Sequence, residues 1–203
     1  SSVTTNLYAG SIVGLAYNTT IKNITVSTAM LVKGAGKVYV GGLAGHVSGS
    51  IQYEIQNVMA MPSTKGSSAG GQNQVDLSDY HTRIYEEDIE SSTASKLKDI
   101  SINIGAISLS ERVFAGGLIG FIHNYDSVAT SAGMTYCTNM NNIVAMSVGN
   151  QPANVYAGGV VGYLDNQMVI EACYNTGSIK TSSTLFDAVG GIDVDVPYAF
   201  CEQ

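Results

Sequence analysis

Phe114-Ala-Gly-Gly-Leu-Ile-Gly120 is the stretch that decides the fold, because the chain repeats it. Related segments are Tyr8-Ala-Gly-Ser-Ile-Val-Gly14, Tyr39-Val-Gly-Gly-Leu-Ala-Gly45, Tyr156-Ala-Gly-Gly-Val-Val-Gly162 and the partial Ala188-Val-Gly-Gly-Ile192. Successive copies begin 31, 75, 42 and 32 residues apart, so the basic period is 31 or 32 residues, with insertions in the second and third units. Periods of roughly 20 to 50 residues indicate a solenoid, a propeller or another repeat array.

The residues of each motif alternate as in a β-strand. Tyr39, Leu43 and Val47 are expected on one face, and Val40 and His46 on the other. A second apolar stretch follows each motif after a turn, and paired glycines at one register favour a bend or a close backbone approach. We therefore predict an all-β fold, a β-helix-like β-solenoid of about five units with an irregular insertion at about 61–98. The units are expected near 8–38, 39–60, 99–155, 156–187 and 188–203.

Asparagines follow the motifs at similar places, as Asn23, Asn57, Asn139 and Asn175. In a coil stacked at the strand spacing of about 4.8 Å, like residues lie above one another, and their amides can form a hydrogen-bonded ladder. The alternative is that asparagine is here only as a common turn residue.

These segments resemble the GLUG-motif repeats of extracellular surface proteins. The resemblance rests on the Tyr/Phe-x-Gly-Gly-Leu-x-Gly copies and on Ala172-Cys-Tyr-Asn-Thr-Gly-Ser-Ile179. It covers most of the chain outside about 61–98, and the first unit departs from it with Ser11 in place of the second glycine. What it implies is a repeat architecture and a binding or structural role at the surface.

The cysteines leave two interpretations open. Cys137 and Cys173 occupy matching places before Asn139 and Asn175. On adjacent rungs their Cα atoms would lie within disulfide reach, and the alternative is a pair of small buried side chains. Cys201 is unmatched, and could pair with Cys173, with another chain or with nothing.

Asn18 and Asn23 each begin an Asn-x-Thr glycosylation sequon. Asn18 lies where a surface corner is expected and is the better acceptor. Asn23 would be occupied by the amide ladder if the ladder forms, so a glycan on Asn23 and the ladder exclude each other there.

Composition limits the function classes. The 203 residues include 9 Lys and Arg against 16 Asp and Glu, a formal net charge of −7, and only 12% are charged. Phosphate contacts need clustered cations, so we expect no nucleic-acid binding. The apolar runs are far shorter than the roughly 20 residues that span a bilayer, so no membrane span is expected. The low charge and the many Ser and Thr residues favour an extracellular or cell-surface location for one repeat domain, cut from a longer protein or mature as it stands.

Residues 61–98 break the repeat and carry the one acidic cluster. Its six acids are Asp76, Asp79, Glu86, Glu87, Asp88 and Glu90. A solvent-exposed segment outside the repeat is the preferred interpretation, and a divalent-cation site or a contact loop is the alternative. The spacing fits no EF-hand or nonapeptide repeat, so no metal and no cofactor are expected.

No catalytic constellation is apparent, so we expect no enzyme. A nucleophile and base made of Cys137 and His123 is conceivable, but a structural column explains Cys137 and Cys173 together. A polysaccharide-degrading β-helix enzyme is one alternative, with Asp76, Asp79 and Arg83 as its first candidates.

The expected function is therefore a non-catalytic structural or adhesive module. Neither end of the repeat carries a polar cap, so the rungs are expected to contact neighbouring repeats or further copies of the chain, head to tail in a fibre. A carbohydrate-binding module is a further alternative, with Tyr17, Tyr163 and Phe121 as platforms for a glycan or another surface ligand. Packing in the core is the preferred interpretation of those three rings.

Overall fold

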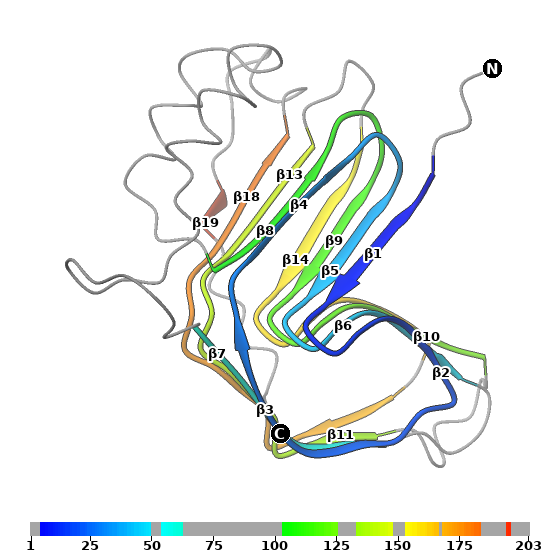
Figure 1. The fold of residues 1–203 in the computed structure, drawn as a ribbon, viewed down its shortest axis with the longest axis vertical. Coiled ribbons are helices and arrows are strands. Elements are labelled where there is room, and N and C mark those ends of the chain that lie inside the picture. The colour runs from blue at the N-terminus through cyan, green and yellow to red at the C-terminus, as the bar shows by residue number, and fades with distance from the viewer. Residues whose placement is uncertain are drawn as a thin grey trace.

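The computed structural model describes residues 5–49, 54–62, 103–125, 133–147, 153–166, 168–183 and 194–195 (Figure 1). These residues form strands joined by turns, and none of them lies in a helix. Four sheets are present, and all strand pairs but one are parallel. The predicted all-β class is confirmed.

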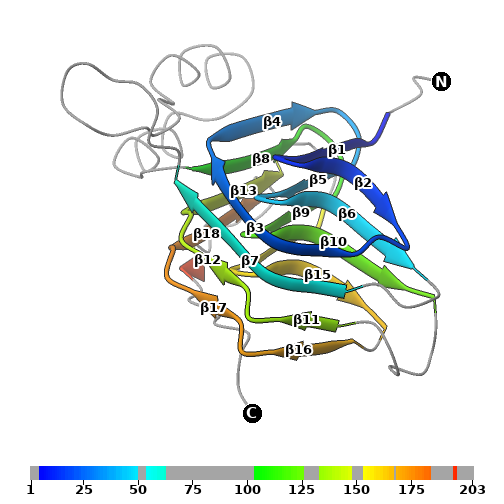
Figure 2. The ribbon, with the colours of Figure 1, turned by 60° about the horizontal axis from the view of Figure 1, so that its bottom comes forward.

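The chain visits the four sheets in a fixed order, here named A, B, C and D, and then returns to the first (Figure 2). Sheet A consists of β1 (Leu7–Gly10), β5 (Val38–Gly41), β9 (Val113–Gly116) and β14 (Val155–Gly158). Sheet B consists of β2 (Val13–Tyr17), β6 (Ala44–Gly49), β10 (Ile119–Asn124) and β15 (Val161–Asp165). We call one passage through the four sheets a circuit.

Sheets C and D complete each circuit. Sheet C consists of β3 (Ile21–Thr28), β7 (Glu54–Pro62), β11 (Gly133–Thr135) with β12 (Thr138–Asn139), and β16 (Val169–Glu171) with β17 (Tyr174–Asn175). Sheet D consists of β4 (Met30–Gly34), β8 (Ile104–Ser108), β13 (Ile143–Ser147), β18 (Ile179–Ser183) and the antiparallel β19 (Val194–Asp195).

The copies of the motif lie in register. Tyr8, Tyr39, Phe114 and Tyr156 are successive partners across sheet A. At the second glycine of the motif, the backbone N–H of Gly42 donates to the carbonyl of Gly117 at 3.2 Å. Like residues therefore lie on like residues, as the repeat predicts.

Two apolar clusters form the core. One lies between sheets A and D and includes Val40, Ala115 and Ile143. The other lies between sheets B and C and includes Leu118, Ile122 and Met134. Most of these side chains have no exposed surface, so each circuit buries its apolar residues against the circuits beside it.

The paired glycines lie where the two clusters meet, and they leave room for side chains from sheet C. A Cβ on Gly117 would overlap the amide of Asn139 and the carbonyl oxygen of Gly159, and one on Gly159 would overlap the amide of Asn175. In the first circuit Ser11 replaces the glycine, and its hydroxyl lies 3.0 Å from that of Thr28. The glycines are thus required by close approach across the interior.

The single alternation predicted for residues 39–47 is wrong. Val40, Leu43 and Val47 are all in the core, whereas Tyr39 and His46 contact each other on the outer side. The bend at the paired glycines shifts the phase of the alternation, because the chain passes there from sheet A to sheet B.

The insertion lies inside the second circuit rather than between two units. β8 pairs with β4 on one side and with β13 on the other, so it is the fourth strand of that circuit. The unit expected at 99–155 therefore divides after Ser108. Of the unit expected at 188–203, only Val194–Asp195 is described, and it runs antiparallel to β18.

Candidate functional site

A column of aromatic rings lines the outer face of sheet A. Tyr8 and Tyr39 stack at 4.7 Å, Tyr39 and Phe114 at 4.8 Å, and Phe114 and Tyr156 at 5.2 Å, with interplanar angles of 13° or less. In-register pairing places these rings one strand spacing apart, which suits parallel stacking. Burial, with Tyr8 as the second cause, raises the pKa of Tyr39.

A second row of rings on sheet B packs against this column. Phe121 and Tyr163 stack at 5.3 Å, and Phe121 meets Phe114 edge to face at 5.1 Å. His46 contacts both Tyr39 and Phe121. The preferred core interpretation is wrong, because Phe121 is half-buried among rings outside both apolar clusters, and Tyr163 and Tyr17 are 36% and 58% exposed.

A third row follows on the same outer face of sheet B. Register pairs Tyr17 with Ser48, Ser48 with His123 and His123 with Asp165. Tyr125 follows the end of β10, and its ring contacts His123 at 4.3 Å and Tyr17 at 6.2 Å. Ser48, between Tyr17 and His123 in register, is only 5% exposed. We call Tyr17, Tyr125, His123 and Asp165 the outer row.

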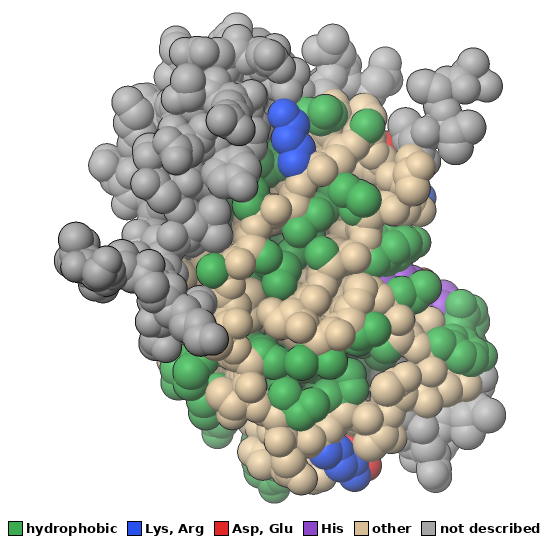
Figure 3. Space-filling model, in the orientation of Figure 1, with side chains coloured by type: hydrophobic (Ala, Val, Ile, Leu, Met, Phe, Trp, Pro, Cys, Tyr) green, Lys and Arg blue, Asp and Glu red, His purple; other side chains and the backbone are tan. Residues whose placement is uncertain are grey.

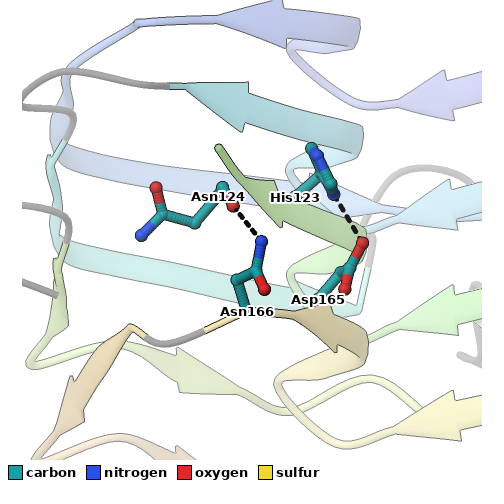
Figure 4. Close-up of polar contacts among 4 residues, drawn as sticks. All are labelled: His123, Asn124, Asp165 and Asn166. Atoms are coloured by element: carbon teal, nitrogen blue, oxygen red, sulfur yellow. Dashed lines mark hydrogen bonds and ion pairs between the residues drawn. The ribbon is translucent and has the colours of Figure 1, made fainter. Parts of the chain in front are cut away.

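The polar end of the outer row is a histidine–carboxylate pair (Figure 4). The Nδ1 atom of His123 lies 2.6 Å from Oδ2 of Asp165, and the two side chains are 27% and 43% exposed. Beside them the amide of Asn166 donates to the backbone carbonyl of Asn124 at 2.6 Å. Figure 3 shows histidine side chains flanked by hydrophobic ones on the side of the molecule where Figure 1 places sheet B.

Sequence reasoning missed this pair because its members differ in type. A positional signal was nevertheless present. His123 follows Phe114 by nine residues, and Asp165 follows Tyr156 by nine. Equal offsets within two copies of an in-register repeat predict neighbouring side chains.

His46 is the one described residue whose side-chain nitrogens are both buried and without a hydrogen-bond partner. Burial, with a smaller contribution from His123, lowers the pKa of His46. The ring is therefore expected to be neutral at pH 7.

Cys137 and Cys173 are both fully buried free thiols, so the structure has the predicted column of small buried side chains and no disulfide between them. The Cys137 thiol donates to the carbonyl of Thr135 at 3.2 Å, and that of Cys173 to Glu171 at 3.3 Å. A hydrogen bond from Cys173 lowers the pKa of Cys137, against an opposite effect of burial.

The predicted single ladder of four asparagines is wrong, because two separate pairs exist. The amide of Asn57 donates to Asn23 at 2.9 Å on the surface, and that of Asn139 donates to Asn175 at 2.8 Å inside. In register Asn139 lies beside Ala60, three residues beyond Asn57. The apolar residues of sheet C fix the register, and the number of residues between motif and asparagine differs between units.

A left-handed backbone conformation, rather than a ladder, explains why Asn23 and Asn57 are asparagines. Their φ angles are 56° and 52°, and the residues at the same corner, Tyr136 and Ala172, have 55° and 50°. Asparagine tolerates this left-handed conformation better than other non-glycine residues. At these two positions asparagine is therefore a turn residue, the alternative interpretation.

Both asparagines of the glycosylation sequons, Asn18 and Asn23, have solvent-exposed surface. Asn18 is half-buried at a corner with φ 46°, and Asn23 is exposed despite its bond to Asn57. The hydrogen bond with Asn57 therefore does not bury Asn23, and both glycosylation sites stay predictions.

Several predicted residues lie outside the described ranges, namely Cys201, Arg83 and the acidic cluster between Asp76 and Glu90. Within the described ranges no three His, Cys, Asp or Glu side chains are grouped to hold a metal ion. The same part of the chain contains no helix of the length and apolarity that crossing a membrane requires.

No protein-family model, curated protein or solved structure matches this chain. The resemblance to GLUG-motif repeats thus stays a prediction from the motif residues alone.

Proposed function

We propose that the chain is a β-solenoid module with a non-catalytic structural and adhesive role at the cell surface, and that copies of it stack head to tail. The observation that carries the proposal is the in-register column of like residues across the circuits. A column of this kind can continue wherever a further circuit presents matching residues.

The two ends of the stack match each other in residue type. If a second copy followed β14, its Tyr8 would meet Tyr156, and its Ala9 would meet Ala157. In sheet C the column of Lys22 ends at Glu171, so opposite charges would meet there. Unpaired edge strands supply the backbone groups for such a contact.

Exposed apolar side chains also concentrate at the ends. Ten large hydrophobic residues are exposed among those the structure describes, and seven of them belong to the first or the last circuit. Those seven are Tyr8, Ile12, Leu15, Tyr17, Tyr163, Val169 and Tyr174. Stacking on another copy would cover the side of these residues that faces the next circuit, and this partial burial favours the contact.

One strand opposes a continuous stack. β19 occupies the outer edge of β18, so sheet D can continue only if β19 detaches. Only two residue pairs form this contact, and sheets A, B and C carry no such strand among the described residues.

Charge exchange at the ends tests the proposal. Sedimentation velocity and negative-stain microscopy should show wild-type oligomers that lengthen with concentration. K22E alone and E171K alone should shorten them, because each places like charges at every contact. An equimolar mixture of the two variants should restore length, since every contact then joins opposite charges. A wild-type protein that stays monomeric, or a mixture no longer than either variant, would refute head-to-tail stacking. Thermal melts control for the lost ion pair of Lys22 with Glu54, which lies 2.5 Å away.

A further inference from the structure

We propose that the outer row on sheet B is a binding site for a neutral oligosaccharide. The site lies on the side of the stack, so it does not depend on contacts between ends. Its four side chains come from three different circuits, which only the in-register fold brings together.

The row offers ring surface to a ligand. Tyr17 is 58% and Tyr125 57% exposed, and the two rings meet edge to face. The column on sheet A is different, because its rings cover one another's faces. Aromatic faces pack well against the flat C–H surface of a sugar ring.

The row also offers hydrogen-bonding atoms. Oδ2 of Asp165 is used by His123, whereas no described residue bonds to Oδ1 of Asp165 or to Nε2 of His123. A carboxylate oxygen accepts, and the second imidazole nitrogen donates or accepts. Adjacent sugar hydroxyls, each both donor and acceptor, satisfy such a pair of atoms.

Charge and length narrow the ligand class. No strand of sheet B contains Lys or Arg, and the chain carries a formal net charge of −7, so an acidic glycan would be repelled. The row extends from the first circuit to the fourth, three strand spacings or about 14 Å. That length exceeds one sugar ring, so a chain of several units is expected to bind more tightly than a disaccharide.

Binding should be measured by titration calorimetry with neutral glucan, xylan, mannan and galactan oligosaccharides of two to six units, with polygalacturonate fragments as the acidic comparison. Oligosaccharides of at least one neutral series should bind, and their affinity should increase with the number of sugar units. Y125A should weaken it about 2- to 10-fold and D165N about 10-fold. Y136A is the matched control, since Tyr136 is 63% exposed at the corner of sheet C, where Ala172 has the same φ, and it should leave affinity unchanged.

Repeating the titration with E171K separates this proposal from stacking, because a variant with shortened oligomers should bind the oligosaccharide equally well. Absence of binding by every neutral series, tighter binding of the acidic fragments, or an equal loss in Y136A would overturn the assignment. Circular dichroism of each variant confirms that the sheets are intact. If Y125A fails that check, Y125F is used with Y17A, and unchanged affinity in Y17A would likewise overturn it.

Discussion

Replacing Gly117 by alanine tests whether the paired glycines are required by space. The φ angle of Gly117 lies outside the left-handed region that favours glycine, so the backbone conformation itself accepts alanine. Its Cβ would nevertheless overlap the carbonyl oxygen of Gly159 and the amide of Asn139. Backbone atoms at the bend of the neighbouring circuit cannot rotate away as a side chain can. We expect G117A to lower the free energy of unfolding by about 2–3 kcal/mol, as overpacked cores do.

Gly133 provides the matched control within the same chain. The nearest atom to a Cβ there is the carbonyl oxygen of Val169 at 3.8 Å, an ordinary contact. G133A should be neutral or stabilise by up to about 1 kcal/mol, through a less flexible unfolded chain. For a chain of this length, the expected Tm of G117A is about 4–12 °C below wild type. Equal midpoints for the two variants, in thermal melts followed by circular dichroism, would refute the argument from close approach.

Further predictions concern the buried polar groups. His46 has a lowered pKa in the folded state, so stability should fall as pH drops below about 6.5, by at most about 1.4 kcal/mol per pH unit; H46F should remove that part of the slope in urea titrations at pH 5 and 7. N139A should destabilise by about 1–3 kcal/mol, because the amide of Asn175 and nearby backbone groups lose their partner, whereas N23A on the surface should change stability by less than about 1 kcal/mol. Cys137 and Cys173 should resist iodoacetamide in the folded protein and react after denaturation, and mass spectrometry showing rapid labelling of the native protein would contradict their burial.

The motif allowed part of the fold to be predicted, because identical residues at a fixed offset determine the register of sheets A and B. Sheet C was harder to predict. Its register depends on Ile21, Ile55, Met134 and Ile170, which lie at different distances from the preceding motif. Asn57 and Asn139 are identical in type and occupy different positions, one required by backbone conformation and the other by hydrogen bonding in the interior.

Only part of the outer row could be predicted from the sequence. Tyr17 was one of the candidate platforms for a glycan, but Tyr125 lies in an irregular position just after a strand. Its contact with Tyr17 extends over an intervening strand, which no local pattern encodes. Tertiary contacts of this kind need the stacked structure to be known.

The place where the second circuit is interrupted has a consequence for engineering. Elsewhere the chain passes from sheet C to sheet D through one to three residues, as between Thr28 and Met30 or Asn175 and Ile179. In the second circuit the same passage runs from Pro62 to Ile104, although both strands occupy ordinary positions in their sheets. Loop length has only a weak effect on stability. Asn103 is buried and hydrogen-bonded to Met30 and Asn142, so it must be kept. A two-residue linker should therefore replace residues 63–102 with little loss of Tm, and a foreign domain with adjacent termini could be displayed from the same point.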